Sequence, residues 1–350
     1  MRKYLLLLPC LLLSALACRA QDKHTWAEGI RDWTGFQIAE PTREGDFNTS
    51  FTLLKERRTV RRDGVVYHYL DVTAAALPYQ SWVKADAMTP AGLERIAQEF
   101  NLIEWFARQY RDERLFTRDK DGARERDYIA RFQAARDSLR LDADLLSRYP
   151  LGAEPFDITA LPVQISDRSV GVSFGFFTGL PLGSLAHLLN PAVGLTLSYE
   201  LRRDAHAFLL DASIGNSTFR REYYGLNGAW MSRKGVLTFC LSASYSRDLV
   251  VSGPWRLSAG AGPCYGVRLF SFEGNEAAPL GGPGLSEGIA LDYRFHRTLS
   301  FSTRHPEQSD VSVRLRLYAD QVWNGRQRNI IPSVNLGVGL HFDNRSLSRR

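Results

Sequence analysis

Alternation of apolar and polar side chains with a period of two is the feature that most constrains this chain of 350 residues. It begins near residue 163, returns at intervals as far as residue 342, and places one set of side chains on each face of an extended strand. In VGLTLSYE, for example, Val193, Leu195 and Leu197 share one face, and Glu200 belongs to the other. The repeats predict eight strands, at about residues 170–176, 193–200, 206–214, 237–245, 255–262, 289–296, 311–318 and 333–342.

The charged residues of these segments lie on the polar face, opposite an almost purely apolar or aromatic face. A soluble antiparallel sandwich also alternates, but it turns its apolar face inward and its charged face to water. A membrane barrel has the reverse arrangement, with a polar interior and an apolar band outside. We therefore predict a closed, eight-stranded antiparallel transmembrane barrel over residues 163–342. The charged residues expected inside it are Glu200, Asp211, Arg256, Arg268, Asp292, Arg294, Arg314 and Arg316.

The predicted connections between strands alternate in length. Those near 202–205 and 249–253 are short, whereas those at 178–191, 215–235, 271–287 and 320–332 are long and rich in Gly, Asn and Pro. Short periplasmic turns and long outer loops are typical of an outer-membrane barrel. The connection near 297–310 is longer than that rule predicts.

The last strand carries a specific motif. The pattern Asn335-x-Gly337-x-x-Leu340-x-Phe342 resembles the C-terminal signal by which the outer-membrane insertion machinery recognises barrel strands. That signal usually ends the chain at the aromatic residue, whereas here residues 343–350 follow as a predicted polar tail. In strand number, the whole segment is similar to small outer-membrane barrels of the OmpA/OmpX type.

The first residues resemble a secretory signal. A positive start is followed by an apolar run too short to span a membrane, which needs about 20 residues, and cleavage after Ala20 would make residues 1–20 a signal peptide. Lipidation of Cys18 is the alternative. Removal of the signal reduces the formal net charge from +6 to +3, which is too small to indicate a nucleic-acid partner.

Residues 21–155 are rich in charged residues and have a mostly helical pattern in place of the period-two alternation. They predict a small periplasmic α+β domain. Asp63-Gly64 suits a tight hairpin turn, and a strand follows it. Thr89 and Pro90 are typical of a helix start, and apolar residues at three- and four-residue steps predict a helix over 89–116. A second helix is predicted over about 124–149.

Part of this domain resembles a bacterial family of putative secreted zinc peptidases of uncharacterised function. Trp33-x-x-Phe36, Ser81-Trp82-Val83 and the later positions Phe100, Glu104 and Arg108 match its layout over residues 26–116. The family's His-Glu-x-x-His positions, however, fall on Arg95, Ile96, Ala97, Gln98 and Glu99. Such a site needs two His on one helix face and a Glu that activates water. The resemblance thus implies a scaffold without its metal chemistry, with Arg95 and Glu99 forming a surface ion pair.

The barrel interior offers few catalytic residues. The late histidines are His296, His305 and His341, and a Ser–His–acid hydrolase needs the His within hydrogen-bond reach of a nucleophilic Ser. His341 and Ser333 both face inward, but neither lies in a recognisable motif. Lumen charges of both signs are expected to pair and to close the interior, because buried charges persist only when paired.

The two cysteines outside the signal, Cys240 and Cys264, also face inward on neighbouring strands. A hairpin centred on Ser252 would place them directly opposite each other, where a disulfide could form. A register shift of one residue would remove that opposition.

We therefore predict an outer-membrane anchored binding or scaffold protein with a non-catalytic periplasmic domain and no cofactor or metal. Its expected partners are outer-membrane lipid, the barrel insertion machinery, and a periplasmic or surface component whose identity the sequence leaves open. Nucleic acid is not among them. The alternatives are an envelope hydrolase, either peptidase-like or at the lumen mouth, and a narrow channel or secretion accessory.

Overall fold

The computed structural model describes residues 23–139, 147–151, 156–220, 223–225, 228–230, 235–270, 280–301, 305–324 and 329–350. The predicted signal peptide and the alternative lipid site at Cys18 lie outside them. The chain divides into two compact units. One contains the chain up to Thr59, His68–Leu161 and Phe301–Arg304, and the other contains Val60–Tyr67, Pro162–Ser300 and His305–Arg350.

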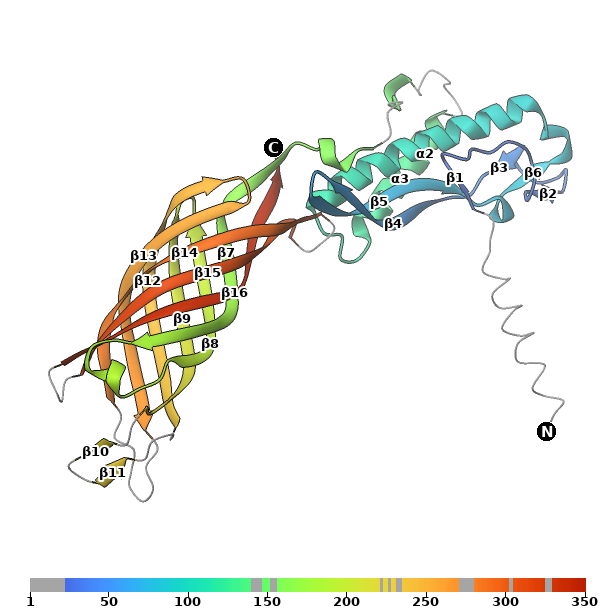
Figure 1. Ribbon diagram of the computed structural model, residues 1–350. Coiled ribbons are helices and arrows are strands. Elements are labelled where there is room, and N and C mark those ends of the chain that lie inside the picture. The colour runs from blue at the N-terminus through green and yellow to red at the C-terminus, as the bar shows by residue number, and fades with distance from the viewer. Residues whose placement is uncertain are drawn as a thin grey trace, which may run out of the picture. The chain divides into compact units, whose positions relative to one another are not determined.

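The residues before Pro162 have the predicted α+β organisation, with short strands, one long hairpin and two longer helices (Figure 1). The strands are β1 His24–Thr25, β2 Gln37–Ala39, β3 Phe47–Asn48, β4 Phe51–Arg62, β5 Val65–Ala76 and β6 Trp82–Lys84. The helices are η1 Pro78–Gln80, η2 Ala85–Ala87, α2 Pro90–Phe116, α3 Ala123–Leu139 and η4 Ile158–Ala160. Strand β6 pairs in parallel with β2 and antiparallel with β3.

Two local predictions are confirmed here. Asp63 and Gly64 join β4 to β5 with φ angles of 52° and 76°, the left-handed backbone that a two-residue hairpin turn requires. Helix α2 begins at Pro90, and the Oγ1 atom of Thr89 accepts a hydrogen bond from the N–H of Gly92 at 3.1 Å. The predicted second helix is described only as far as Leu139, because residues 140–146 lie outside the described part of the chain.

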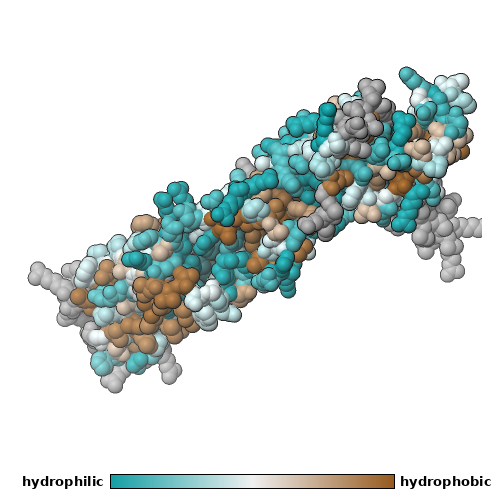
Figure 2. All heavy atoms as spheres, turned by 90° about the horizontal axis from the view of Figure 1, so that it is seen from above, coloured by the Kyte–Doolittle hydropathy of each residue, from teal (hydrophilic) through white to brown (hydrophobic). Residues whose placement is uncertain are grey.

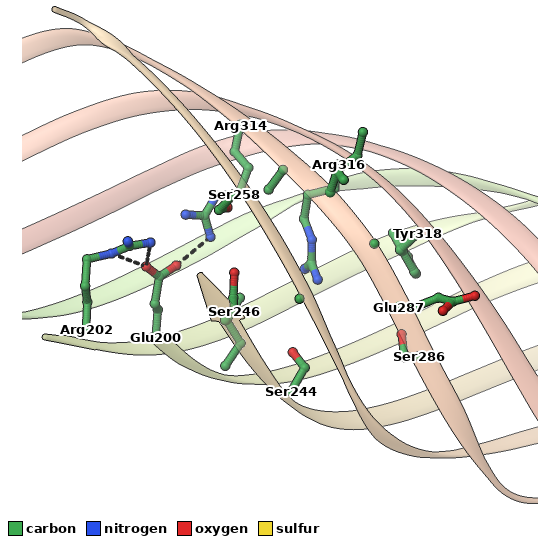
Figure 3. Close-up of a pocket in the computed structure, with 15 residues that line it drawn as sticks. Glu200, Arg202, Ser244, Ser246, Ser258, Ser286, Glu287, Arg314, Arg316 and Tyr318 are labelled. Carbon is green, nitrogen blue, oxygen red and sulfur yellow. Dashed lines mark hydrogen bonds and ion pairs between the residues drawn. The ribbon is translucent and has the colours of Figure 1, made fainter. Parts of the chain in front are cut away.

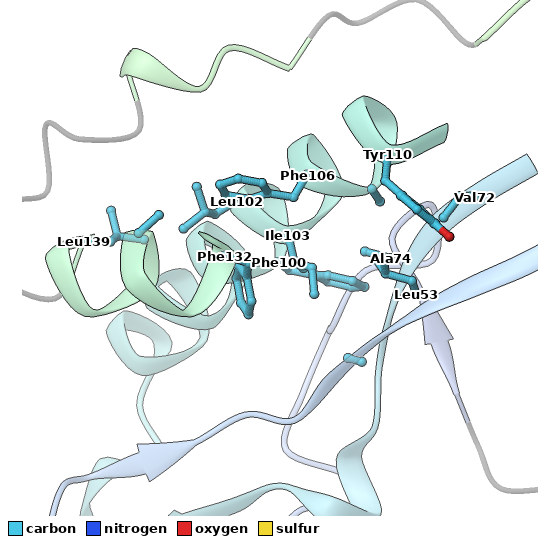
Figure 4. Close-up of a cluster of buried hydrophobic side chains, with 13 residues drawn as sticks. Leu53, Val72, Ala74, Phe100, Leu102, Ile103, Phe106, Tyr110, Phe132 and Leu139 are labelled. Atoms are coloured by element: carbon cyan, nitrogen blue, oxygen red, sulfur yellow. The ribbon is translucent and has the colours of Figure 1, made fainter. Parts of the chain in front are cut away.

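The core of this unit lies between the hairpin and the two helices (Figure 4). The apolar stripe of α2 faces strands β4 and β5 on one side and α3 on the other. The stacked rings of Phe51 and Phe100 have centroids 5.4 Å apart, and Phe132 meets Phe51 edge-on. The buried residues are Leu53, Val72, Ala74, Ala76, Phe100, Leu102, Ile103, Phe106, Ala107, Tyr110, Phe132, Ala135 and Leu139.

The second unit is a closed ring of eight antiparallel strands, as the alternation predicts (Figure 1). Each strand pairs with the next along the chain, and the last pairs with the first, so the ring has no free edge. The strands are β7 Val163–Pro181, β8 Ala192–Arg203, β9 His206–Thr218, β12 Gly235–Ser252, β13 Trp255–Phe270, β14 Leu280–Ser300, β15 Glu307–Asn324 and β16 Asn329–Arg349. The connections hold the short helix η5 Gly183–His187 and the small strands β10 Tyr223–Gly225 and β11 Gly228–Trp230.

Burial in the ring is inverted relative to a soluble protein. Leu197 is 56% exposed and Phe208 is 66% exposed on the outer face, whereas Glu200 and Asp292 are each 2% exposed inside. Figure 2 shows hydrophobic side chains gathered over the outer surface of the barrel. This distribution excludes the soluble sandwich, because a sandwich buries its apolar face.

Three connection predictions need correction. Residues 281–284 belong to β14 although their Gly- and Pro-rich composition predicts a loop, and the connection after Asn324 spans only 325–328. Residues 343–349, predicted as a polar tail, continue β16 and pair with β7. In each case ladder pairing within the closed ring outweighs local composition. Among the described residues, no helix is both long and apolar enough to cross a membrane.

Candidate functional site in the barrel interior

The predicted interior charges come together in the middle of the barrel. Arg314 on β15 contacts Glu200 on β8 at 2.8 Å and Asp292 on β14 at 2.6 Å. Strands β8 and β15 are not neighbours in the ring, so the Arg314–Glu200 contact spans the lumen. Arg202 binds the same Glu200 at 2.6 Å (Figure 3). It also binds Asp248 on β12 at 2.5 Å. Two arginines therefore share one buried carboxylate.

Further ion pairs extend this cluster along the interior. Arg256 contacts Asp292 at 2.7 Å. Arg316 binds Asp211 with both terminal nitrogens, at 2.6 and 3.0 Å. Taking charges out of water is costly, and removal of one partner from a buried pair leaves an uncompensated charge. The pairs therefore hold each other in place and occupy the lumen.

The space left between these side chains is small. A cavity of about 40 Å³ lies beside the cluster. A buried water needs about 10–15 Å³, whereas small-molecule sites occupy about 300–1,000 Å³. The cavity thus has room for a few waters. Its polar lining includes Glu200, Arg202, Ser244, Ser246, Ser258, Ser286, Arg314, Arg316 and Tyr318 (Figure 3).

The candidate hydrolase pair is not brought together. His341 is fully buried, and its Nε2 lies 3.9 Å from an oxygen of Glu200. Ser333 is eight residues away on the same strand, which corresponds to about 26 Å at about 3.3 Å per residue. The serines opposite His341 are Ser173 and Ser312, and both are buried. His296 contacts Thr298 at 2.9 Å.

The cysteine register differs from the prediction. The turn lies at Gly253-Pro254, and a bulge between Asp248 and Val250 shifts the pairing. Cys240 therefore faces Gly266, and Cys264 faces Ser242. The predicted direct opposition is wrong, and both cysteines are free thiols.

The peptidase-like positions of α2 also have other partners than predicted. The carboxylate of Glu99 is buried and pairs with Arg136 of α3 at 2.7 Å, while the guanidinium of Arg95 lies over the ring of Phe47. The predicted Arg95–Glu99 surface pair is thus replaced. Glu104 is buried too, and it accepts hydrogen bonds from the N–H of Ala74 and from Arg108. Both carboxylates connect the helix to its neighbours.

The only group of potential metal ligands within the described residues lies elsewhere, at Cys240, Cys264 and Asp320 of the barrel. Glu99 and Glu104 are not part of it. His68 lies on β5, before α2 in the sequence, and its Nδ1 atom contacts the hydroxyl of Thr59 on β4 at 2.9 Å.

The residues of the proposed insertion signal all lie on β16. Asn335 donates a hydrogen bond to Asp320 inside the barrel, at 2.8 Å, and Phe342 stacks on Phe174 of β7 outside it. Gly337 and Leu340 lie between them on the same strand. Their role as a signal stays a prediction.

Several interior residues were missed by the sequence analysis, namely Arg202, Asp248, Asp310, Asp320 and Asp343. Four of them are buried, the side chain of Asp248 is 8% exposed, and all five continue the inward register of their strands. The same alternation would have identified them if the predicted strands had been extended at their ends. Strand ends were underestimated because their composition resembles that of loops.

Comparison with known proteins gives fold-level similarities. No protein-family model and no curated protein matches the chain. Among solved structures, the attachment invasion locus protein Ail of Yersinia pestis matches over 51% of this chain and 99% of its own, at 9% identity and a TM-score of 0.32. Neisserial surface protein A matches over 51% and 97%, at 15% identity and a TM-score of 0.31. The outer membrane protein OprG of Pseudomonas aeruginosa matches over 55% and 100%, at 11% identity and a TM-score of 0.28.

Proposed function

We propose that this protein is an outer-membrane anchored binding or scaffold protein, in which a closed barrel carries a non-catalytic domain in the periplasm. The observation that carries the proposal is the inverted barrel, with apolar side chains outside and paired charges inside. An outer surface of this kind is stable only against lipid or another apolar surface.

The aromatic residues of the outer face fit a bilayer. Trp255 and Tyr293 are in contact near the end with short turns, with ring centroids 4.6 Å apart, and Trp323 lies near the other end. Tyr293 pairs with Val313, ten residues before Trp323 on β15. Ten residues span about 33 Å along a strand, or about 25 Å along the axis at a tilt of about 40°. This equals the height of the apolar band between aromatic girdles, about 25 Å.

The interior supports an anchor over a pore. Arg314, Glu200 and Asp292 bridge the lumen, and a solute would have to break several buried ion pairs to pass. An eight-stranded barrel leaves an interior just wide enough for side chains. The barrel itself is thus expected to hold the protein in the membrane.

The first unit supports a binding role over catalysis. On α2, the positions that resemble a zinc peptidase hold a cation–π contact at Arg95, a buried Ile96 and a buried ion pair at Glu99. These groups stabilise the fold and leave no histidine pair for a metal. By contrast, Ile38 is 70% exposed on β2, an outer strand of the three-stranded sheet, where an extended segment of a partner could pair.

Three experiments on the full chain test this function. In detergent micelles, the folded barrel is expected to migrate differently before and after boiling, and in planar bilayers it is expected to show no discrete conductance. In cells, a photo-crosslinker at position 38 is expected to capture an envelope component, and one at Arg62 serves as an exposed control. Discrete conductance steps would establish the channel alternative and overturn the anchor. Absence of a heat-dependent shift would overturn the barrel's membrane role.

A further inference from the structure

We propose that Cys240, Cys264 and Asp320 form a binding site for a thiophilic divalent cation of the zinc class inside the barrel. Their two sulfurs and a carboxylate oxygen lie within 4.8 Å of one another. They come from three strands, β12, β13 and β15, near the end of the barrel that carries the long connections. The inference does not depend on the anchor function.

The strand register favours a metal over a disulfide. Cys240 pairs with Gly266 and Cys264 with Ser242, so the two cysteines are diagonal neighbours. Diagonal positions have a spacing of about 7–8 Å, whereas a disulfide usually needs Cα atoms about 4.4–6.8 Å apart. Two sulfurs on one tetrahedral Zn²⁺ at about 2.3 Å need a spacing of only about 3.8 Å between sulfurs, which two diagonal side chains can reach.

The carboxylate is held in position by its own partners. Ser286 donates a hydrogen bond to one oxygen of Asp320 at 2.7 Å, and Asn335 donates to the other at 2.8 Å. Each carboxylate oxygen keeps a second lone pair for a cation. Outer partners of this kind orient ligands in metal sites.

Space is left beside two of the three ligands. A cavity of about 30 Å³ is lined by Cys240, Asp320 and the hydroxyl-bearing residues Thr238 and Ser333. Gly266 contributes to this space, because a Cβ atom there would come within 2.7 Å of Val322. The cavity is large enough for a cation with one water as a fourth ligand.

A positive side chain balances the site. Arg268 lines the same cavity, and its Nη1 atom is buried without a hydrogen-bond partner among the described residues. Two thiolates, one carboxylate and a divalent cation together carry one negative charge, which the guanidinium compensates. Binding replaces two thiol protons by two metal–sulfur bonds, releases both protons to solvent, and involves no oxidation.

The test uses the full chain with Cys10→Ser and Cys18→Ser, which leaves Cys240 and Cys264 as its two cysteines, in detergent micelles, after chelation and without reductant. A thiol assay on the denatured protein is expected to find two free thiols. Addition of Cd²⁺ is then expected to produce a thiolate-to-metal charge-transfer band that saturates at one ion per chain, and Zn²⁺ is expected to displace it.

Variants assign the ligands. Cys240→Ser and Cys264→Ser are each expected to abolish the band while the heat-dependent gel migration stays unchanged. Ser286→Ala is expected to weaken binding about 10–100-fold, because it frees the carboxylate to rotate. The matched control is Glu287→Gln, which removes an exposed carboxylate from the next position of β14 and is expected to bind as the unaltered protein does.

Three results would overturn the site: no free thiols in the unreduced protein, no band in a folded chain with two free thiols, or equal weakening by Ser286→Ala and Glu287→Gln. The gel migration and bilayer recordings test the anchor separately, so failure of one proposal is distinguishable from failure of the other.

Discussion

At the scale of single residues, the charges inside the barrel are stabilised by carboxylates that more than one arginine contacts. Glu200 binds both Arg202 and Arg314, and all three side chains are no more than 3% exposed. In the first unit, Asp119 plays a comparable part at the surface. It accepts hydrogen bonds from the Tyr110 hydroxyl and from the N–H groups of Arg124 and Glu125 near the start of α3.

Replacement of Glu200 is expected to destabilise the barrel strongly. Glu200→Gln leaves two buried guanidinium groups without their common anion, and loss of one partner from a buried pair costs about 3–5 kcal/mol. Urea unfolding of the full chain in micelles, followed by tryptophan fluorescence, measures the free energy of unfolding. The control is Asp167→Asn, which breaks a half-exposed pair with Arg203 and is expected to cost about 0–1 kcal/mol. Equal effects of the two substitutions would contradict the role of the buried network.

Acid is expected to loosen the start of α3. Burial raises the pKa of Asp119, but the hydrogen bonds from Glu125, Arg124 and Tyr110 outweigh this and leave the pKa below its ordinary value. A lowered pKa means that Asp119 adds stability above the unfolded value of about 3.9, which is lost as pH falls through the folded pKa. The protection of the Glu125 amide against hydrogen exchange, relative to an unfolded chain at the same pH, is expected to fall in that acidic range. Asp119→Asn should remove this pH dependence, and an unchanged profile would refute it.

At the scale of elements, strand β16 closes the ring by pairing with β7 along nearly its whole length. Its last residues form pairs such as Asn344 with Val170 and Leu347 with Ile165. Asp343 also lies 3.9 Å from Arg256. The sequence resemblance, by contrast, ends the strand at Phe342.

Truncation after Phe342 tests whether the residues that follow it act as part of β16 or as a tail. Removal of residues 343–350 deletes ladder pairs on both sides of β16, so we expect a smaller folded fraction on an unboiled gel and a lower midpoint of urea unfolding. Deletion of Arg350 alone is the control, because β16 ends at Arg349. If the truncated chain folded as well as the control, residues 343–350 would act as a tail.

At the scale of the whole molecule, the outer face of the barrel is expected to be embedded in the lipid bilayer. Leu197 lies near the middle of β8 and Val250 two residues before the end of β12, where it pairs with Leu257, and both face outward. Charge is most costly at the bilayer midplane and least costly near its interfaces.

The cost of an arginine substitution is expected to depend on how deep the substituted residue lies in the bilayer. Leu197→Arg should lower the free energy of unfolding in lipid vesicles by about 2–4 kcal/mol, and Val250→Arg by about 0–1 kcal/mol. Reversible urea unfolding measures both values. Equal costs at the two positions would argue that this surface is not embedded in a bilayer.

The sequence by itself determined which side chains share a face, since a period of two survives any arrangement of strands. This alternation predicted eight strands and their inward charges. Turn-forming and helix-capping residues predicted the turn at Asp63-Gly64 and the start of α2. Only the tertiary structure decided which of these groups meet. The contact between Glu200 and Arg314, 114 positions apart, depends on ring closure. The cysteine register depends on the position of one turn and on one bulge, and the partner of Glu99 depends on helix packing. Pairing is a long-range property, and alternation is a local one.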